Sequence, residues 1–329
     1  MRPSRLSLTY LLATKNKLEY LKVVLERAIA ARKSDEEIIV IDGASNDGTP
    51  LYLEDLHSKG LIQDFRSEPD IGQSHATNKG LMLAKGELVK FITDDDVFLF
   101  DEIQKCKEFM LSHPAYPALV TNMAFYTEHS PLKTVHPWLE YENLHREWME
   151  GKRRNYVFSD LSLMIRRSEL PRLGLFNPAV MFLDTEYAIR ITTIAEIAFY
   201  TAVAAVRVAN EKSTVGRNLV RCESECKKIS VFYDYVYPPA PPPPTILQKM
   251  RRPLRKLKKA LRRRFFGVHK PAPPAGEKME FRRTVQLLVE NIEQYNKSRE
   301  KVFLLRDSNT TPVEPILADG EKLRPESQL

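Results

Sequence analysis

Three consecutive aspartates, Asp94, Asp95 and Asp96, are the residues of this chain that most directly suggest chemistry. They follow the apolar run 88–92, which has the composition of a buried strand. Adjacent carboxylates repel one another unless a cation lies among them. Mg²⁺ and Mn²⁺ typically take one or two carboxylates and complete their shell with water and phosphate oxygens. The triplet is therefore either a divalent-metal site or a solvated acidic turn, and taken alone the turn is the more ordinary interpretation.

A second polar cluster, Asp42 to Thr49, also follows an apolar run, and a regular framework must position both clusters. Short apolar runs typical of strands alternate with segments that carry apolar residues at helical spacing. We expect strands at 6–13, 37–41, 62–67 and 88–92, and helices at 18–31, 50–58 and 76–84. This alternation predicts an α/β fold, a mostly parallel sheet covered by helices, in which ligands bind at the carboxyl ends of the strands.

The rest of the chain is less regular. We expect further strands at 118–125, 158–165 and 197–208, helices at 102–111 and 185–195, and a separate helix from the apolar spacing over 281–295.

Several classes of protein are excluded by what the sequence lacks. No run of about 18 apolar residues is present and Met1 to Arg5 leads into a strand, so neither a membrane-spanning helix nor a signal peptide is expected. The three cysteines fit neither a disulfide framework nor a zinc site, which favours a reducing cytoplasm. The glycines form neither a G-x-G-x-x-G nor a G-x-x-x-x-G-K-[ST] motif, which excludes a dinucleotide fold and a P-loop.

The net charge of +7 results from a concentration of basic residues in one segment. Lys249 to Arg264 contains ten Lys or Arg and no acid, and the remainder carries −3, so general nucleic-acid binding is not expected. Proline clusters mark the boundaries along the chain. We divide it into a globular domain at 1–237, a Pro-rich linker at 238–248, a basic amphipathic helix at 249–267, a helical extension at 268–306 and a disordered tail at 307–329.

Four segments in this order resemble the nucleotide-binding half of the family 2 glycosyltransferases, and they are Ala13–Asn16, Ile38–Thr49, Ser67–Gly80 and Gly86–Phe98. The resemblance covers about residues 6–220. It implies a single-domain glycosyltransferase A fold of the Rossmann-like kind, a nucleotide-diphosphate sugar donor, a divalent metal (Mn²⁺ or Mg²⁺) and inversion at the anomeric carbon. It also shifts the interpretation of the aspartate triplet from a turn to a metal site.

The resemblance assigns roles position by position. It implies that Thr14 and Asn16 line the nucleoside pocket and that Asp42 hydrogen-bonds the base. It also implies that Asn78 and Gly80 shape the floor near the donor. In the aspartate triplet, it implies that Asp95 faces the ribose or sugar and that Asp96 ligates the metal. Asp94 is an extra acid to which we assign no role.

A later segment, 174–190, resembles the acceptor side of the family and places Asp184 in the general-base position. A sugar hydroxyl is a weak nucleophile, so a carboxylate must accept its proton while the bond to the anomeric carbon forms. Without the family pattern, a helix N-cap would be the ordinary role for Asp184. Glu186 is expected to be a supporting acid.

Two positions depart from the family pattern. His75 stands where an acid is common, and Asn210 stands where many members place a histidine that helps to bind metal or phosphate. Asn210 could supply only a neutral oxygen, for which Lys212 would compensate. The Q-x-x-R-W signature of processive synthases is missing, which favours transfer of one or a few sugars.

Two further features leave alternatives open. The aromatic residues Trp138, Tyr141, Trp148 and Tyr156 form either an acceptor platform, because sugar rings pack on aromatic faces, or core under a long loop. The basic segment 249–265 carries leucines at helical spacing. This pattern favours an interfacial helix on an anionic membrane over a solvated linker or an RNA-binding tail.

Together these observations predict an inverting glycosyltransferase that transfers a hexosyl or N-acetylhexosaminyl group to a hydroxyl of a glycan or lipid-linked acceptor. We expect it to act in cell-surface polysaccharide synthesis, peripherally at the inner face of the membrane. A sugar nucleotidyltransferase is the rival enzyme, although 11–17 lacks the Gly-rich phosphate loop of that class. A membrane-associated nucleotide-sugar-binding module without turnover is the rival from another class.

Overall fold

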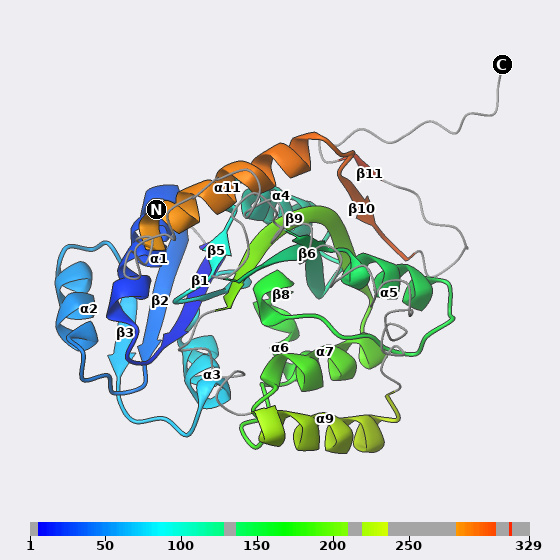
Figure 1. Cartoon of the computed structure of the whole chain (residues 1–329), viewed down its shortest axis with the longest axis horizontal. Helices are drawn as coiled ribbons and strands as arrows, with labels where there is room; N and C mark the ends of the chain where they lie inside the picture. The colour runs from blue at the N-terminus through cyan, green and yellow to red at the C-terminus, as the bar shows by residue number, and fades with distance from the viewer. Residues whose placement is uncertain (1–5, 128–135, 210–218, 236–280, 307–315, 318–329) are drawn as a thin grey trace, which may run out of the picture.

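Strands and helices alternate in the amino-terminal half, as its apolar pattern predicts (Figure 1). The computed structural model describes residues 6–127, 136–209, 219–235, 281–306 and 316–317. Parallel pairs join β1 (Leu8–Thr14) to β2 (Glu36–Asp42), β1 to β4 (Leu88–Thr93), and β2 to β3 (Asp64–Ser67). The connecting helices are α1 (Leu18–Ala31), α2 (Thr49–Ser58) and α3 (Gln73–Leu83).

The register of these strands brings their carboxyl ends to one edge of the sheet. Thr14 at the end of β1 lies opposite Asp42 of β2, and Ala13 lies opposite Thr93 of β4. The polar residues that follow each strand therefore gather at this edge, where α/β sheets bind ligands.

The second half extends the same sheet. Its elements are β5 (Val97–Phe98), α4 (Phe100–Ser112), β6 (Ala118–Thr127), β7 (His136–Trp138), α5 (Glu140–Met149), β8 (Leu163–Arg166), α6 (Leu170–Leu173), α7 (Leu183–Ile194), β9 (Ile197–Ala209) and α9 (Leu219–Tyr233). β8 lies antiparallel between β4 and β6, and β6 pairs in parallel with β9. With β10 (Val302–Leu304) and β11 (Ile316–Leu317) from the carboxyl-terminal segment, the strand order is β11-β10-β9-β6-β8-β4-β1-β2-β3.

Both faces of the sheet are buried, which explains why its strands are apolar throughout. Leu8, Tyr10 and Leu12 of β1 belong to a core shared with α1 and α4, whereas Leu11 belongs to a core shared with α3, α5 and α7. Side chains of a strand alternate between the two faces, so β1 contributes to both cores.

The carboxyl-terminal segment adds to the same body. α11 (Phe281–Lys297) packs through Val285, Leu288 and Ile292 on residues of β5 and β9. Then β10 (Val302–Leu304) pairs antiparallel with β9, and β11 (Ile316–Leu317) pairs with β10. Two residues of the tail that we expected to be disordered thus form a strand, because they complete hydrogen bonds at the sheet edge.

Other expectations differ from the structure in detail. The strand expected at 158–165 is a 3-10 turn, η1 (Asp160–Ser162), followed by the shorter β8, and α9 was not predicted at all. The Pro-rich linker and the basic helix expected at 249–267 lie outside the described residues. In the described part of the chain, no helix combines the length and apolar character that a bilayer crossing requires.

Candidate active site

A cavity of about 590 Å³ opens at the carboxyl ends of β1 and β4. Six stretches distant in sequence form most of its wall: the end of β1, the end of β4, the residues around the start of α3, the η1 turn, the start of α7, and the end of β9. Its ionisable side chains are Lys15, Lys17, Asp70, Asp94, Asp95, Asp96, Tyr141, Asp160, Asp184 and Arg207. Six carboxyl groups thus share the cavity with three basic side chains.

The first two aspartates of the triplet are bound to Lys17. The Lys17 ammonium lies 3.0 Å from Asp94 Oδ1 and 2.7 Å from Asp95 Oδ2. Thr14 donates a hydrogen bond of 2.7 Å to the other oxygen of Asp94. Burial nevertheless raises the pKa of Asp94 to about 6, against the opposing effect of Lys17. One lysine therefore offsets only part of the negative charge gathered here.

Asp96 is held by a different pair of donors. The Thr93 hydroxyl lies 2.6 Å from Asp96 Oδ2, and the backbone amide of Val208 lies 2.7 Å from Oδ1. Burial, and then the neighbouring Asp95, raise the pKa of Asp96 to about 7. The carboxylate is thus oriented by two neutral donors while its charge lacks full compensation.

Asp184 lines the cavity together with the triplet, in the first turn of α7. The N-cap of this helix is Phe182, so Asp184 does not serve as the cap. Its Oδ1 atom accepts a hydrogen bond of 2.7 Å from the Thr185 amide. Burial and then Asp160 raise the pKa of Asp184 to about 6, whereas Arg207 lowers it. A carboxyl group with a pKa just below neutral suits a general base, since it is ionised at neutral pH and still accepts a proton.

Five charged residues of the cavity had no role predicted from the sequence: Lys15, Lys17, Asp70, Asp160 and Arg207. Burial raises the pKa of Asp160, and Arg207 opposes that rise. A signal for Arg207 was present, because it is the lone charged residue in the apolar strand 197–209. Asp160 was hidden in a segment expected to be a strand.

Two residues expected at the nucleoside pocket, Asn16 and Asp42, are not among the residues that line the cavity. The buried Asp42 accepts hydrogen bonds from the Ser45 amide at 3.0 Å, from the Ser67 hydroxyl at 2.6 Å and from the Ser45 hydroxyl. Asn16, with φ of 55°, accepts a bond of 2.9 Å from the Asn46 amide. Both therefore shape the loops after β1 and β2, whereas Thr14 itself lines the cavity.

Asn78 and Gly80 hold α3 in place beneath the donor side. The Asn78 side chain brackets the backbone of Phe176, donating to its carbonyl at 2.8 Å and accepting from its amide at 2.9 Å. A Cβ atom at Gly80 would lie 2.1 Å from a methyl group of Leu11, so a larger residue here would force the Leu11 side chain of β1 to move. Their contacts indicate a role in positioning and not in direct donor contact.

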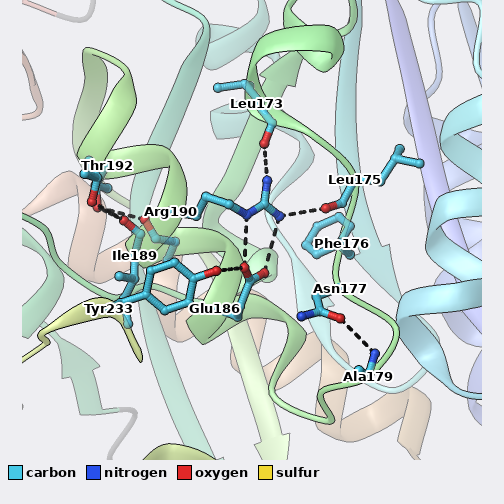
Figure 2. A network of polar contacts seen from close by, with 12 residues as sticks. Leu173, Leu175, Phe176, Asn177, Ala179, Glu186, Ile189, Arg190, Thr192 and Tyr233 are labelled. Carbon is cyan, nitrogen blue, oxygen red and sulfur yellow. Dashed lines mark hydrogen bonds and ion pairs between the residues drawn. The ribbon is translucent and has the colours of Figure 1, made fainter. Parts of the chain in front are cut away.

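Glu186 belongs to a structural network below the cavity (Figure 2). It pairs with Arg190 at 3.0 Å and accepts a hydrogen bond from the Tyr233 hydroxyl. Arg190 also donates to the backbone carbonyls of Leu173 and Leu175. This network ties α7 to α9 and to the loop after α6, which supports the wall that carries Asp184.

The sequence left open whether the aromatic residues between 138 and 156 form an acceptor platform or pack in the core, and the structure shows that they differ in position. Trp148 and Tyr156 are buried in the core, whereas Tyr141 lines the cavity and Trp138 is 41% exposed. Only Tyr141 is thus placed to meet a ligand in the cavity.

The acidic side chains could hold a divalent cation if phosphate oxygens and water supplied the remaining ligands. Among the residues that the structure describes, no group of three or more His, Cys, Asp or Glu side chains forms a cage for a metal. One or two carboxylates with surplus charge suffice when phosphate oxygens and water complete the shell. Asp96, whose charge is only partly compensated by Arg207, meets this requirement. Asn210 and Lys212 fall outside the described ranges.

Comparisons with known proteins agree with this architecture. Residues 10–170 match the family described as Glycosyl transferase family 2. The mannosyltransferase PcManGT of Pyrobaculum calidifontis, solved with GDP-Man and Mn²⁺, superposes with a TM-score of 0.53 and 17% identity, over 88% of this chain and 86% of that one. Residues 1–349 of S. aureus TarS superpose with a TM-score of 0.50 and 12% identity, over 93% and 98% of the two chains.

The similarity has limits in length and in sequence. A superposition on the S. aureus TarS chain has a TM-score of 0.49 at 12% identity, and it covers 94% of this chain and 60% of that one. The chain thus spans about three fifths of that protein, and the sequence matches none of the curated proteins. The family match and the shared architecture agree with each other, and we conclude that residues 10–170 form a glycosyl transferase family 2 domain in a chain with a glycosyltransferase A type fold.

Proposed function

We propose that the protein transfers a sugar from a nucleotide-diphosphate sugar to a hydroxyl group, with inversion at the anomeric carbon. The observation that carries this proposal is the sharing of one cavity by the aspartate triplet and Asp184. Asp184 accepts the acceptor's hydroxyl proton as that oxygen bonds to the anomeric carbon. The bond from this carbon to the diphosphate breaks in the same step, and the nucleoside diphosphate leaves.

The donor diphosphate carries negative charge into a cavity that is already acidic. A Mn²⁺ or Mg²⁺ ion held by Asp96 would supply the charge that stabilises the leaving diphosphate. Lys17 offsets part of the negative charge of Asp94 and Asp95 on the donor side. We expect Asp95 to face the ribose or sugar of the donor. The complex of PcManGT with GDP-Man and Mn²⁺ supports the pairing of a nucleotide sugar with a metal on this fold.

The experiment is a thermal-shift screen of GDP- and UDP-sugars and nucleoside diphosphates, each with and without Mn²⁺. A ligand at 100 times its Kd stabilises the fold by about 2.7 kcal/mol. We expect a Mn²⁺-dependent shift in the wild type and its loss in Asp96→Ala. The exposed Asp101 on α4 provides a matched control variant, Asp101→Ala, which should keep the shift. Full Mn²⁺-dependent donor binding by Asp96→Ala would refute the metal assignment.

We also propose that the acceptor is a glycan or a lipid-linked molecule. In this proposal residues 249–265 bind the protein to an anionic membrane surface, where the acceptor is located. The outer face of α9 supports this location, since Lys227 and Lys228 share it with Val231 and Phe232, which are 85% and 81% exposed. Basic residues flanking exposed apolar side chains suit the interface of an anionic bilayer. Glu225 of α9 accepts a hydrogen bond of 2.7 Å from the amide of Met181, which lines the cavity.

Sedimentation with vesicles of anionic and of neutral lipid tests the membrane proposal. Replacing Leu254, Leu257 and Leu261 by serine, together with Val231→Ser and Phe232→Ser, should abolish binding to anionic vesicles. A control with Leu51→Ser and Met82→Ser removes exposed apolar side chains from α2 and α3 and should still bind. Equal binding by both variants would place the membrane contact elsewhere or show that charge alone carries it.

A further inference from the structure

Lys90 lies in the middle of β4 and is 2% exposed. A lysine in this position is costly, because burial of an ammonium group without water requires full compensation by protein groups. Burial lowers the pKa of Lys90 to about 8. None of the roles assigned above uses this side chain, so its contacts indicate what it does.

The ammonium of Lys90 donates to two backbone carbonyls of the segment that carries Asp160. Its Nζ atom lies 2.5 Å from the Leu161 carbonyl oxygen and 3.2 Å from the Leu163 carbonyl oxygen. The same nitrogen lies 5.9 Å from the centre of the Phe98 ring. Lys90 therefore fastens the end of η1 to the central strand of the sheet.

Leu161, whose carbonyl oxygen accepts a hydrogen bond from Lys90, also donates a hydrogen bond to Asp160. The backbone amide of Leu161 donates to Asp160 Oδ1 at 3.0 Å, and the Ser159 hydroxyl donates to the same oxygen at 3.1 Å. Leu161 thus connects the buried ammonium, through one peptide unit, to a carboxylate that lines the cavity. Asp160 in turn acts on Asp184, since it is the main charged group that raises the pKa of Asp184.

We propose that Lys90 is a positioning residue for glycosyl transfer, which fixes the η1 turn so that the Asp160 carboxylate is held in the cavity beside the general base Asp184. The side chain does not touch substrate and acts through the Leu161 peptide. The inference rests on the proposed function for its catalytic consequence, whereas its structural part concerns the η1 turn alone.

The chain offers a matched control in Lys107 of α4, which is also a buried lysine. Its ammonium contacts the carboxylates of Glu36 at 2.8 Å and Asp35 at 3.1 Å, near the opposite ends of the strands. Lys90→Met and Lys107→Met thus remove the same charge from two buried places, and only the first place is joined to the cavity.

The first measurement is amide hydrogen exchange of the peptide that contains Leu161. Losing a hydrogen bond from a charged donor corresponds to about a tenfold or larger change in an opening equilibrium. We expect exchange at Leu161 to accelerate by about this factor in Lys90→Met and not in Lys107→Met. Unchanged exchange in Lys90→Met would overturn the proposal whether or not transfer is observed. If Lys90→Met does not fold, Lys90→Gln retains a polar donor in the strand and takes its place.

The second measurement is steady-state transfer. Lys90→Met should lower kcat by about tenfold or more. The donor KM should stay within about twofold, because the residues that we assign to donor binding are unchanged. Combining it with Asp160→Asn should cause no further loss, since both substitutions act on one carboxylate. Full kcat in Lys90→Met, or losses that multiply, would overturn the inference. Absence of transfer by the wild type would instead contradict the proposed function, and the exchange result would still decide the structural part.

Discussion

Buried acidic side chains lie at both ends of the parallel strands, but they have different bonding partners at the two ends. At the amino ends, Glu36 contacts Lys107 and Gln104 at 2.8 Å each, and Glu37 accepts from the Thr9 hydroxyl and the Lys85 amide at 2.6 Å each. At the carboxyl ends, Asp96 and Asp184 are held by neutral donors, and burial raises the pKa of both.

The difference separates stability from function within one sheet. At the amino ends, Glu36 pairs with Lys107 and Glu37 has neutral hydrogen-bond donors within the protein, so the loss of these partners should affect folding. Charges at the carboxyl ends remain partly uncompensated and open to the cavity, so they are available to a ligand. Four predictions test this contrast.

The largest effect should come from Asp184→Asn. Because an amide cannot accept the hydroxyl proton, we expect kcat for transfer to fall by about 10²- to 10⁴-fold. Donor binding measured by calorimetry should be unchanged, since the triplet is untouched. Loss of donor binding with an intact fold would show that Asp184 belongs to the donor site and not to the acceptor side.

At the opposite end, Lys107→Met should reduce stability and spare activity. It leaves the fully buried Glu36 without its ion-pair partner, and breaking a buried pair typically costs about 3–5 kcal/mol. Urea unfolding and the transfer rate of the remaining folded protein provide the two measurements. A variant that is fully stable but inactive would reverse the contrast.

The stability of the ligand-free protein should depend on pH through the carboxyl end. The folded pKa values of Asp94, Asp96 and Asp184 are raised to about 6, about 7 and about 6. The folded state therefore binds more protons than the unfolded state, so the free energy of unfolding should decrease as pH rises from about 4 to about 7. Urea unfolding at fixed ionic strength tests the trend, which Asp96→Asn should weaken.

The smallest effect should come from an exposed ion pair. Lys59 lies 2.7 Å from Asp55 on the surface of α2, and both side chains are more than half exposed. Lys59→Ala should change the free energy of unfolding by less than about 1 kcal/mol and leave transfer unchanged. A larger loss would mean that charge pairing alone, without burial, stabilises this protein.

Much of the fold could be predicted because it depends on local apolar spacing. The bounds expected for α1 are those of the structure, and each strand from β1 to β4 lies within two residues of its expected position. The carboxyl edge was predicted for the same reason, since polar clusters follow β2 and β4. Asp184 and the triplet were thus brought to one cavity as expected, while their catalytic and metal roles stay predictions.

The rest depends on contacts between distant segments. Asp160 and Lys17 reach the cavity through a 3-10 turn and a loop, whose positions no periodicity reveals. The hydrogen bonds of Asn78 to the backbone of Phe176 could not be predicted, because the two residues are 98 positions apart in the sequence. The helical extension was expected, but its attachment was not predicted: the Asn296 side chain of α11 hydrogen-bonds both the amide and the carbonyl of Val203 in β9.

The packing of α11 and β10 against β9 makes the basic region an insertion with two anchored ends. The described residues on either side of this region are fixed in the fold: Tyr235 is 2% exposed, and the ring of Phe281 contacts Tyr20. The 45 residues from 236 to 280 span at most about 3.5 Å each when extended, so a fixed return point limits their reach to roughly 80 Å. Cutting the chain after Tyr235 would also remove a helix and a strand of the core. Removing this insertion alone therefore requires an internal replacement by a flexible linker that preserves both anchors.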